Sequence, residues 1–94
     1  MKFISLKPSP KKDKKYVIKF SNPDKTIHFG SKNSQTYLDH NDADIRQNYI
    51  NRHRVNENWN DVNPGSLSLY LLWGPTNDLE TNLNFFLDVF DISK

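Results

Sequence analysis

The stretch YVIKFSNPDKTIHFG, residues 16–30, decides how the chain begins to fold. Its two ends are rich in β-branched and aromatic residues, which favour strands, and the turn-forming residues SNPDK stand between them. Pro23 has a fixed φ angle that suits a turn at this point. The stretch therefore predicts a β-hairpin with strands over residues 16–20 and 26–30, joined by a five-residue loop.

Two flanking segments extend this hairpin into a small antiparallel sheet. MKFISL, residues 1–6, predicts a third strand, in which Phe3 and Ser5 share one face because side chains alternate along a strand. QTYLD, residues 35–39, has strand-forming residues as well and predicts a short fourth strand.

A helix is expected next, from a cap at Asn41 or Asp42 to about Val55. One face of this helix should pack on the core, and it is formed by residues at helical spacing: Ile45, Tyr49, Ile50 and His53. His53 should stand at the edge of that core and donate to a backbone or carboxylate partner. The arginines of this helix, Arg46, Arg52 and Arg54, lie mostly outside that apolar face. Nearby acids offer them partners at helical spacings: Asp42, Asp44 and Glu57.

Two more helices complete the chain. Residues 66–73 contain LSLYLLW, which is apolar almost all round, and Gly74 stops this helix. The last helix starts at TNDLE, where Asn77 and Glu80 have capping-box spacing, and runs on to Ile92. The sequence predicts an α+β fold, with a small antiparallel sheet followed by about three helices.

The charge is distributed unevenly along a chain of 94 residues with a net charge of +2. Residues 1–20 hold seven lysines against one aspartate, a net charge of +6. KPSPKKDKK, residues 7–15, has two prolines and five lysines and few groups to bury, so residues 1–15 are expected to form a basic, partly flexible arm. Residues 16–94 are then a single domain.

Such an arm suits phosphates, because each neutralised phosphate releases counterions; a solvated tail is the alternative. The arm and the arginine helix together give the candidate residues for nucleic-acid or other polyanion binding: Lys7, Lys11, Lys12, Lys14, Lys15, Lys32, Arg46, Arg52 and Arg54.

The last two helices carry more apolar surface than a small core needs. A symmetric dimer would cover the surplus, and its expected interface consists of Leu69, Leu72, Phe85, Phe86, Val89 and Phe90. In a monomer the sheet would cover these side chains, or the face would recruit another protein. No apolar run approaches the length of about 20 residues that spans a bilayer, so no membrane partner is expected.

No catalytic group emerges from the sequence. The chain has no cysteine, which excludes disulfides and thiol nucleophiles. A metal-dependent nuclease would need His28, His40 and His53 to converge, but no pair of them has metal-ligand spacing. HFGSKN, residues 28–33, lacks the spaced glycines of a phosphate loop. We expect no catalytic residue, no metal and no cofactor.

Four motifs follow one another in a recognisable order: H-F-G-x-K at 28–32, H-x-D at 40–42, Y-I-x-R-H-R-x-N-E-N-W at 49–59, and a glycine followed by L-S-x-x-x-L-W at 65–73. Over residues 16–76 this series resembles a small uncharacterised family encoded by large nucleocytoplasmic DNA viruses, and the marseillevirus type is the most similar. That family tends to have a basic run before the tyrosine, whereas this chain has only Arg46 there. The difference shifts the expected phosphate contacts toward the lysines.

The resemblance implies a virus-encoded, virion-packaged protein and supplies no enzymatic activity. Together with the residues above, it leads us to expect a non-enzymatic, dimeric viral protein that binds DNA or another polyanion. Its expected locations are the virion, the host cell cytoplasm and the host nucleus. The alternative is a structural or interaction module that recruits a viral or host partner through its apolar helical face.

Overall fold

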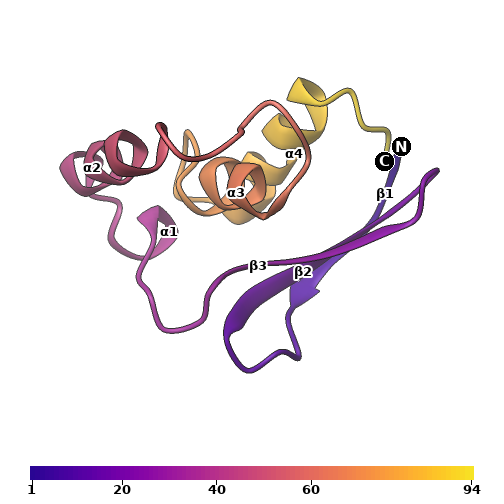
Figure 1. Ribbon diagram of the computed structural model, residues 1–94, viewed down its shortest axis with the longest axis horizontal. Coiled ribbons are helices and arrows are strands. Elements are labelled where there is room, and N and C mark those ends of the chain that lie inside the picture. Colours follow the sequence, from indigo (N-terminus) through magenta and orange to yellow (C-terminus); the bar gives the residue numbers. More distant parts are fainter.

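In a computed structural model, which describes residues 1–94, a three-stranded antiparallel sheet is followed by helices (Figure 1). The later helices lie over one face of the sheet, and the first two lie past its end. The strands, in the spatial order β1-β2-β3, are β1 (Lys2–Pro8), β2 (Lys14–Ser21) and β3 (Lys25–Ser31). The helical elements are α1 (Tyr37–His40), α2 (Ala43–His53), α3 (Pro64–Leu67), the π-helical turn η1 (Ser68–Leu72) and α4 (Leu79–Val89). The predicted α+β fold is confirmed.

Strands β2 and β3 form the predicted hairpin. Tyr16 pairs with Phe29 and Ile18 pairs with Ile27, so these four side chains share the face that the helices cover. The connection is shorter than predicted, because the pairing continues to the ends of both strands and leaves only residues 22–24 between them.

Strand β1 confirms the predicted third strand but not its predicted faces. The register with β2 shifts between Phe3 and Ser5, so Ile4 is an extra residue in a bulge. Phe3 and Leu6 therefore both pack against the core, whereas Ile4 is exposed. A shift of one residue exchanges the two faces of a strand, which is why simple alternation failed here.

The predicted fourth strand is wrong, because residues 35–39 enter the short helix α1. Thr36 precedes the helix, and its backbone N–H donates to Asp39 Oδ2 at 2.7 Å. This bond satisfies the Thr36 backbone N–H at the start of the helix, and the helix prevails over the strand preference of the side chains.

The basic segment over residues 1–15 differs from the partly flexible arm that its composition predicts. Strand β1 takes up residues 2–8, and β2 begins at Lys14. In the turn between them Ser9 is buried, its N–H donates to Lys15 O at 3.0 Å, and its hydroxyl contacts His28 Nδ1 at 2.7 Å. Pairing between β1 and β2 gives the backbone groups of this lysine-rich segment their hydrogen-bond partners, so the segment is ordered although its side chains bury little apolar surface.

The core lies mainly between the sheet and the last three helical elements, and α2 contributes Tyr49 to it. It consists of Ile18, Phe20, Phe29, Tyr49, Leu67, Leu71, Leu72, Trp73, Leu83, Phe86, Leu87 and Ile92. Trp73 N–H donates to Ser68 O at 3.1 Å, a bond that spans five residues and defines the π turn. Through this turn the apolar helix predicted over residues 66–73 lies at the centre of the core.

A buried asparagine ties α4 to the loop before it. Asn82 Nδ2 donates to Leu71 O at 3.0 Å and to Thr76 O at 2.8 Å. Its Oδ1 accepts from the N–H and the hydroxyl of Thr76, at 3.1 and 2.7 Å. The helix itself is capped by Asp78, one residue later than predicted, because the Asp78 carboxylate accepts from Thr81 N–H.

Candidate polyanion-binding surface and adjoining cleft

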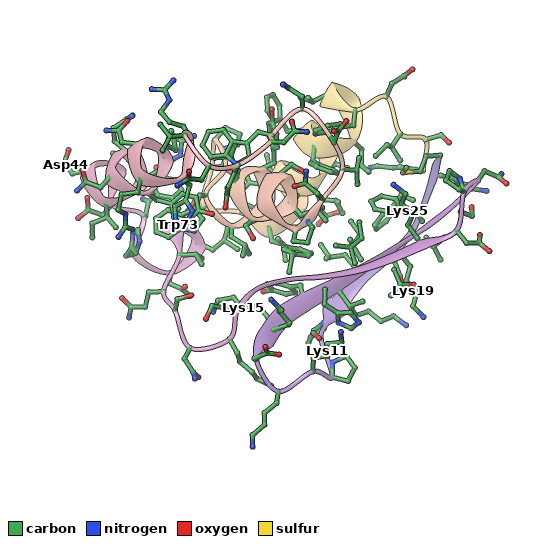
Figure 2. The ribbon with its side chains drawn as sticks, in the orientation of Figure 1. Lys11, Lys15, Lys19, Lys25, Asp44 and Trp73 are labelled. Atoms are coloured by element: carbon green, nitrogen blue, oxygen red, sulfur yellow. The ribbon has the colours of Figure 1, made fainter.

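One face of the sheet has no helix over it. Because alternate residues of a strand point to opposite sides, this uncovered face carries Lys7 and Ser5 from β1 and Lys19 from β2. The turn before β2 adds Lys11 and Lys12, both exposed. Figure 2 shows Lys11 and Lys19 on the side of the sheet away from the helices.

The two layers of the molecule have opposite net charges. Residues 1–31, which form the sheet, hold eight lysines against two aspartates, a net charge of +6. Residues 32–94, which form the helical layer, hold five cationic residues against nine acidic ones, a net charge of −4. The charge asymmetry of the sequence therefore becomes a difference between two sides of the molecule.

The basic side chains are not neutralised by acids of the same chain. The only contact within 4.0 Å between groups of opposite charge type is between His53 and Glu57. The predicted pairing of acids with the α2 arginines is wrong: Asp42 instead caps α2 by accepting from two backbone N–H groups, and Glu57 has other partners.

The predicted polyanion-binding residues fall into three places. The uncovered face carries Lys7, Lys11 and Lys12. The end of the sheet carries Lys14, Lys15 and Lys32, where Lys15 Nζ donates to Lys32 O at 3.4 Å. The helical layer carries the three arginines.

Arg46 is held inside the helical layer and has a structural role. Its Nε donates to Trp73 O at 2.9 Å and to Gly74 O at 3.0 Å, and its guanidinium lies over the Tyr37 ring, 5.6 Å from the centroid. The carbonyls at the end of a helical element need such donors. Arg52 and Arg54, in contrast, are exposed.

The six residues predicted for a dimer interface do not share one surface. Leu72 and Phe86 lie in the core of the single chain. Leu69 and Phe90 are half-buried against it. Phe85 and Val89 are 45% and 47% exposed and stand one turn apart on α4.

The three histidines make separate local contacts. His28 contacts Ser9, as described above, and His40 Nδ1 accepts from Asp42 N–H at 3.0 Å. The ring of His53 stacks on that of Tyr49, with centroids 4.2 Å apart. No group of three or more His, Asp or Glu side chains lies close enough together to hold a metal ion.

A cleft of about 680 Å³ separates the end of the sheet from α2 and α3. One wall includes Lys14 from β2 and the opposite wall includes Arg52 and His53 from α2. Ligand pockets have typical volumes of about 300–1,000 Å³, so the cleft has room for a small molecule.

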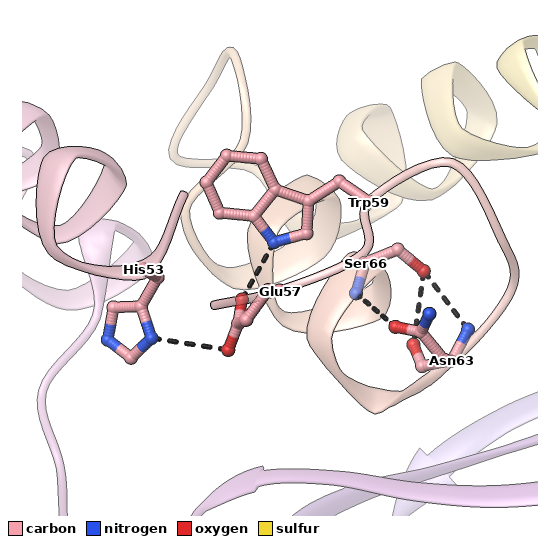
Figure 3. A network of polar contacts seen from close by, with 5 residues as sticks. All are labelled: His53, Glu57, Trp59, Asn63 and Ser66. Carbon is pink, nitrogen blue, oxygen red and sulfur yellow. Dashed lines mark hydrogen bonds and ion pairs between the residues drawn. The ribbon is translucent and has the colours of Figure 1, made fainter. Parts of the chain in front are cut away.

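The carboxylate of Glu57 fixes the orientation of His53 in this cleft. Figure 3 shows it between the imidazole of His53, whose Nδ1 is 3.2 Å from Oε1, and the indole of Trp59, whose Nε1 donates to Oε2 at 2.7 Å. Beside them Asn63 and Ser66 cap α3 reciprocally. The expectation that the His53 ring has a carboxylate partner is confirmed.

Tyr49 lies between two aromatic rings at the inner side of the cleft. His53 covers one face, and Trp73 covers the other at a centroid distance of 4.3 Å and an interplanar angle of 5°. Burial raises the pKa of the Tyr49 hydroxyl to about 12, and the nearby negative charge of Glu57 adds to this shift. The hydroxyl therefore stays protonated and able to donate at neutral pH.

Glu57 and Trp59 were missed as site residues in the sequence. The signal was present, since Tyr49, His53 and Glu57 follow one another at intervals of four, the spacing of one helical face. The chain leaves α2 after His53, however, so helical spacing alone does not predict where Glu57 lies.

The fold and surface define a small α+β protein whose sheet is covered on one side and basic on the other. The chain belongs to a family of unknown function (DUF5754), which it matches over residues 4–53. The matched region contains most of the sheet, α1 and α2, and it ends at His53. No curated protein and no solved structure matches the chain. None of the helices is long and apolar enough to cross a membrane.

Proposed function

We propose that the chain is a non-enzymatic, virus-encoded protein that binds DNA or another polyanion through the uncovered, lysine-bearing face of its sheet. The observation that carries this proposal is the set of exposed lysines without an acidic partner on a face that no helix covers: Lys7, Lys11, Lys12 and Lys19. Unpaired cations can exchange their counterions for phosphates, which drives sequence-independent binding. The acidic helical layer would face away from the polyanion.

The viral origin rests on the motif resemblance described above. The same resemblance supports a location in the virion and, after infection, in the host cell cytoplasm and nucleus. There a small basic protein would meet the viral genome, which is the polyanion that this proposal favours.

The test is the salt dependence of binding to unrelated DNA duplexes, measured by fluorescence anisotropy. Deleting residues 1–15 would remove β1 and damage the fold, so point variants are preferable. The double variant Lys7→Gln/Lys19→Gln removes two charges from the uncovered face. The matched control, Lys25→Gln/Lys94→Gln, removes the same charge elsewhere.

A plot of log K against log salt concentration has a negative slope, and we expect the first variant to make that slope less steep by about 2, since each phosphate contact contributes about 0.9. The control should leave the slope nearly unchanged. If no duplex binds at low salt, or if both variants change the slope equally, the proposed surface is wrong.

Self-association through α4 is a second candidate, favoured by the exposure of Phe85 and Val89. Two large apolar side chains one turn apart give a strip that a second copy of the chain would cover by symmetry. Sedimentation equilibrium should then give twice the mass of one chain, and the variant Val89→Asp should give the mass of one chain. A single mass for the unmodified chain at high concentration would instead leave the strip open to a viral or host protein.

A further inference from the structure

The cleft beside α2 has a polar lining that the proposed sheet surface does not use. Its cationic groups come from two different elements, Lys14 on β2 and Arg52 on α2, and neither has an acidic partner within 4.0 Å. Arg52 is exposed at the mouth of the cleft. An anion that enters between these walls would meet charge from both sides.

Of the two acids that line the cleft, Glu57 is already engaged. Both of its oxygens have partners, the imidazole of His53 and the indole of Trp59. Gly65 lies directly behind it, since a Cβ there would stand 3.3 Å from the carboxyl carbon. Asp13, the other acid, belongs to the turn that also holds Lys11 and Lys12.

His53 and Tyr49 add directed hydrogen-bonding groups. With Nδ1 turned to Glu57, the Nε2 edge of His53 remains for a ligand, and its side chain is 38% exposed. Nε2 accepts a hydrogen bond in the neutral ring and donates one in the imidazolium. A phosphate monoester, whose second pKa is about 6, supplies an oxygen for either form. Tyr49 also lines the cleft, and its hydroxyl is a further donor.

The Tyr49 ring at the inner side of the cleft does not offer a stacking platform. Both faces of Tyr49 are covered, by His53 and by Trp73. A nucleobase therefore cannot stack on this ring, and recognition should depend on the phosphate alone.

We propose that the cleft binds a phosphate monoester, with Arg52 and Lys14 supplying positive charge and Tyr49 and His53 supplying directed hydrogen bonds. Two sources carry this group: a free sugar phosphate, and the 5′-phosphate end of a nucleic acid. Only the second rests on the proposed function, since a strand on the lysine-bearing face would have to pass the turn at Asp13 to reach the cleft.

Calorimetric titration of the full chain tests the proposal, with inorganic phosphate, ribose 5-phosphate, AMP and adenosine as probes. Ribose 5-phosphate and AMP should bind with similar affinity, and adenosine should not bind. Arg52→Gln should weaken ribose 5-phosphate binding roughly 10- to 100-fold, the usual effect of losing a charged hydrogen-bonding group. Both arginines are exposed, so the matched control Arg54→Gln should stay folded and keep the affinity.

The proposal fails if ribose 5-phosphate does not bind, if adenosine binds as well as AMP, or if the two arginine variants weaken binding equally. A second measurement identifies the source, using single strands that differ only in a 5′-phosphate or a 5′-hydroxyl. A preference for the phosphorylated strand that Arg52→Gln abolishes assigns a nucleic-acid end. Binding of ribose 5-phosphate without that preference assigns a free sugar phosphate, whether or not duplexes bind the sheet.

Discussion

Replacing Asn82 with aspartate should remove much of the stability of the fold, although it changes only one group. Asn82 is fully buried and uses both amide hydrogens and both acceptor positions of its oxygen. A carboxylate has the same shape but cannot donate. The carbonyl oxygens of Leu71 and Thr76 would then lose their donors and face a negative charge.

The expected loss follows from these contacts. Each buried carbonyl left without a donor costs about 1–3 kcal/mol, so two of them lower the free energy of unfolding by about 2–6 kcal/mol. Domains of this size are stable by only about 5–15 kcal/mol. Asn82→Asp should therefore lose a large part of its stability at pH 7.

Urea denaturation followed by circular dichroism measures this loss. Asn84→Asp is the matched control, because Asn84 lies on the same helix, is only half-buried and makes no hydrogen bond through its side chain. Burial should raise the pKa of the introduced carboxyl, so the deficit should shrink as the pH falls and the carboxyl gains a proton to donate. A loss below about 1 kcal/mol, or one equal to that of the control, would refute the reasoning.

Three further predictions concern the surroundings of the cleft. Because the folded-state pKa of Tyr49 is about 12 and its ordinary value is 10.0, stability should fall as the pH rises from 10 to 12. Tyr49→Phe should remove this high-pH phase from a tyrosine absorbance titration. Arg46→Lys should lower the free energy of unfolding in urea by about 1–2 kcal/mol, because an ammonium replaces a guanidinium held by two carbonyls and an aromatic ring; Arg54→Lys should not. Gly65→Ala should displace the Glu57 carboxylate, and the indole N–H resonance of Trp59 in an NMR spectrum should shift as its acceptor moves.

The hairpin was predictable because its signals are local. The strand residues of YVIKF and TIHFG and the turn between them lie within 15 residues, so no distant contact was needed to interpret them. The bulge at Ile4 was not predictable, since no turn-forming residue marks it in F-I-S-L and only the pairing with β2 reveals the shift. Thr36 and Asp39 carried a capping signal, but the strand-forming residues beside them pointed the other way.

The candidate site was predictable in part for the same reason. The lysines of residues 1–20 could be counted, but their position on the uncovered face depends on the register of β1 with β2. Arg46 looks like its exposed neighbours in sequence, and its two carbonyl partners lie 27 and 28 residues further along the chain. The cleft has walls from α2 and from β2, so no local pattern could indicate it.

The separation of charge between the two layers gives the molecule a permanent electric dipole moment directed across the sheet. The electric field of a large anion would rotate such a dipole before contact, so that the lysines face the anion and the acidic helices face away from it. Such pre-orientation shortens the rotational search that normally limits the association of proteins. For Lys7→Gln/Lys19→Gln we therefore expect a larger decrease in the rate constant of association with a polyanion than increase in the rate constant of dissociation. Added salt should likewise slow the association of the unmodified chain.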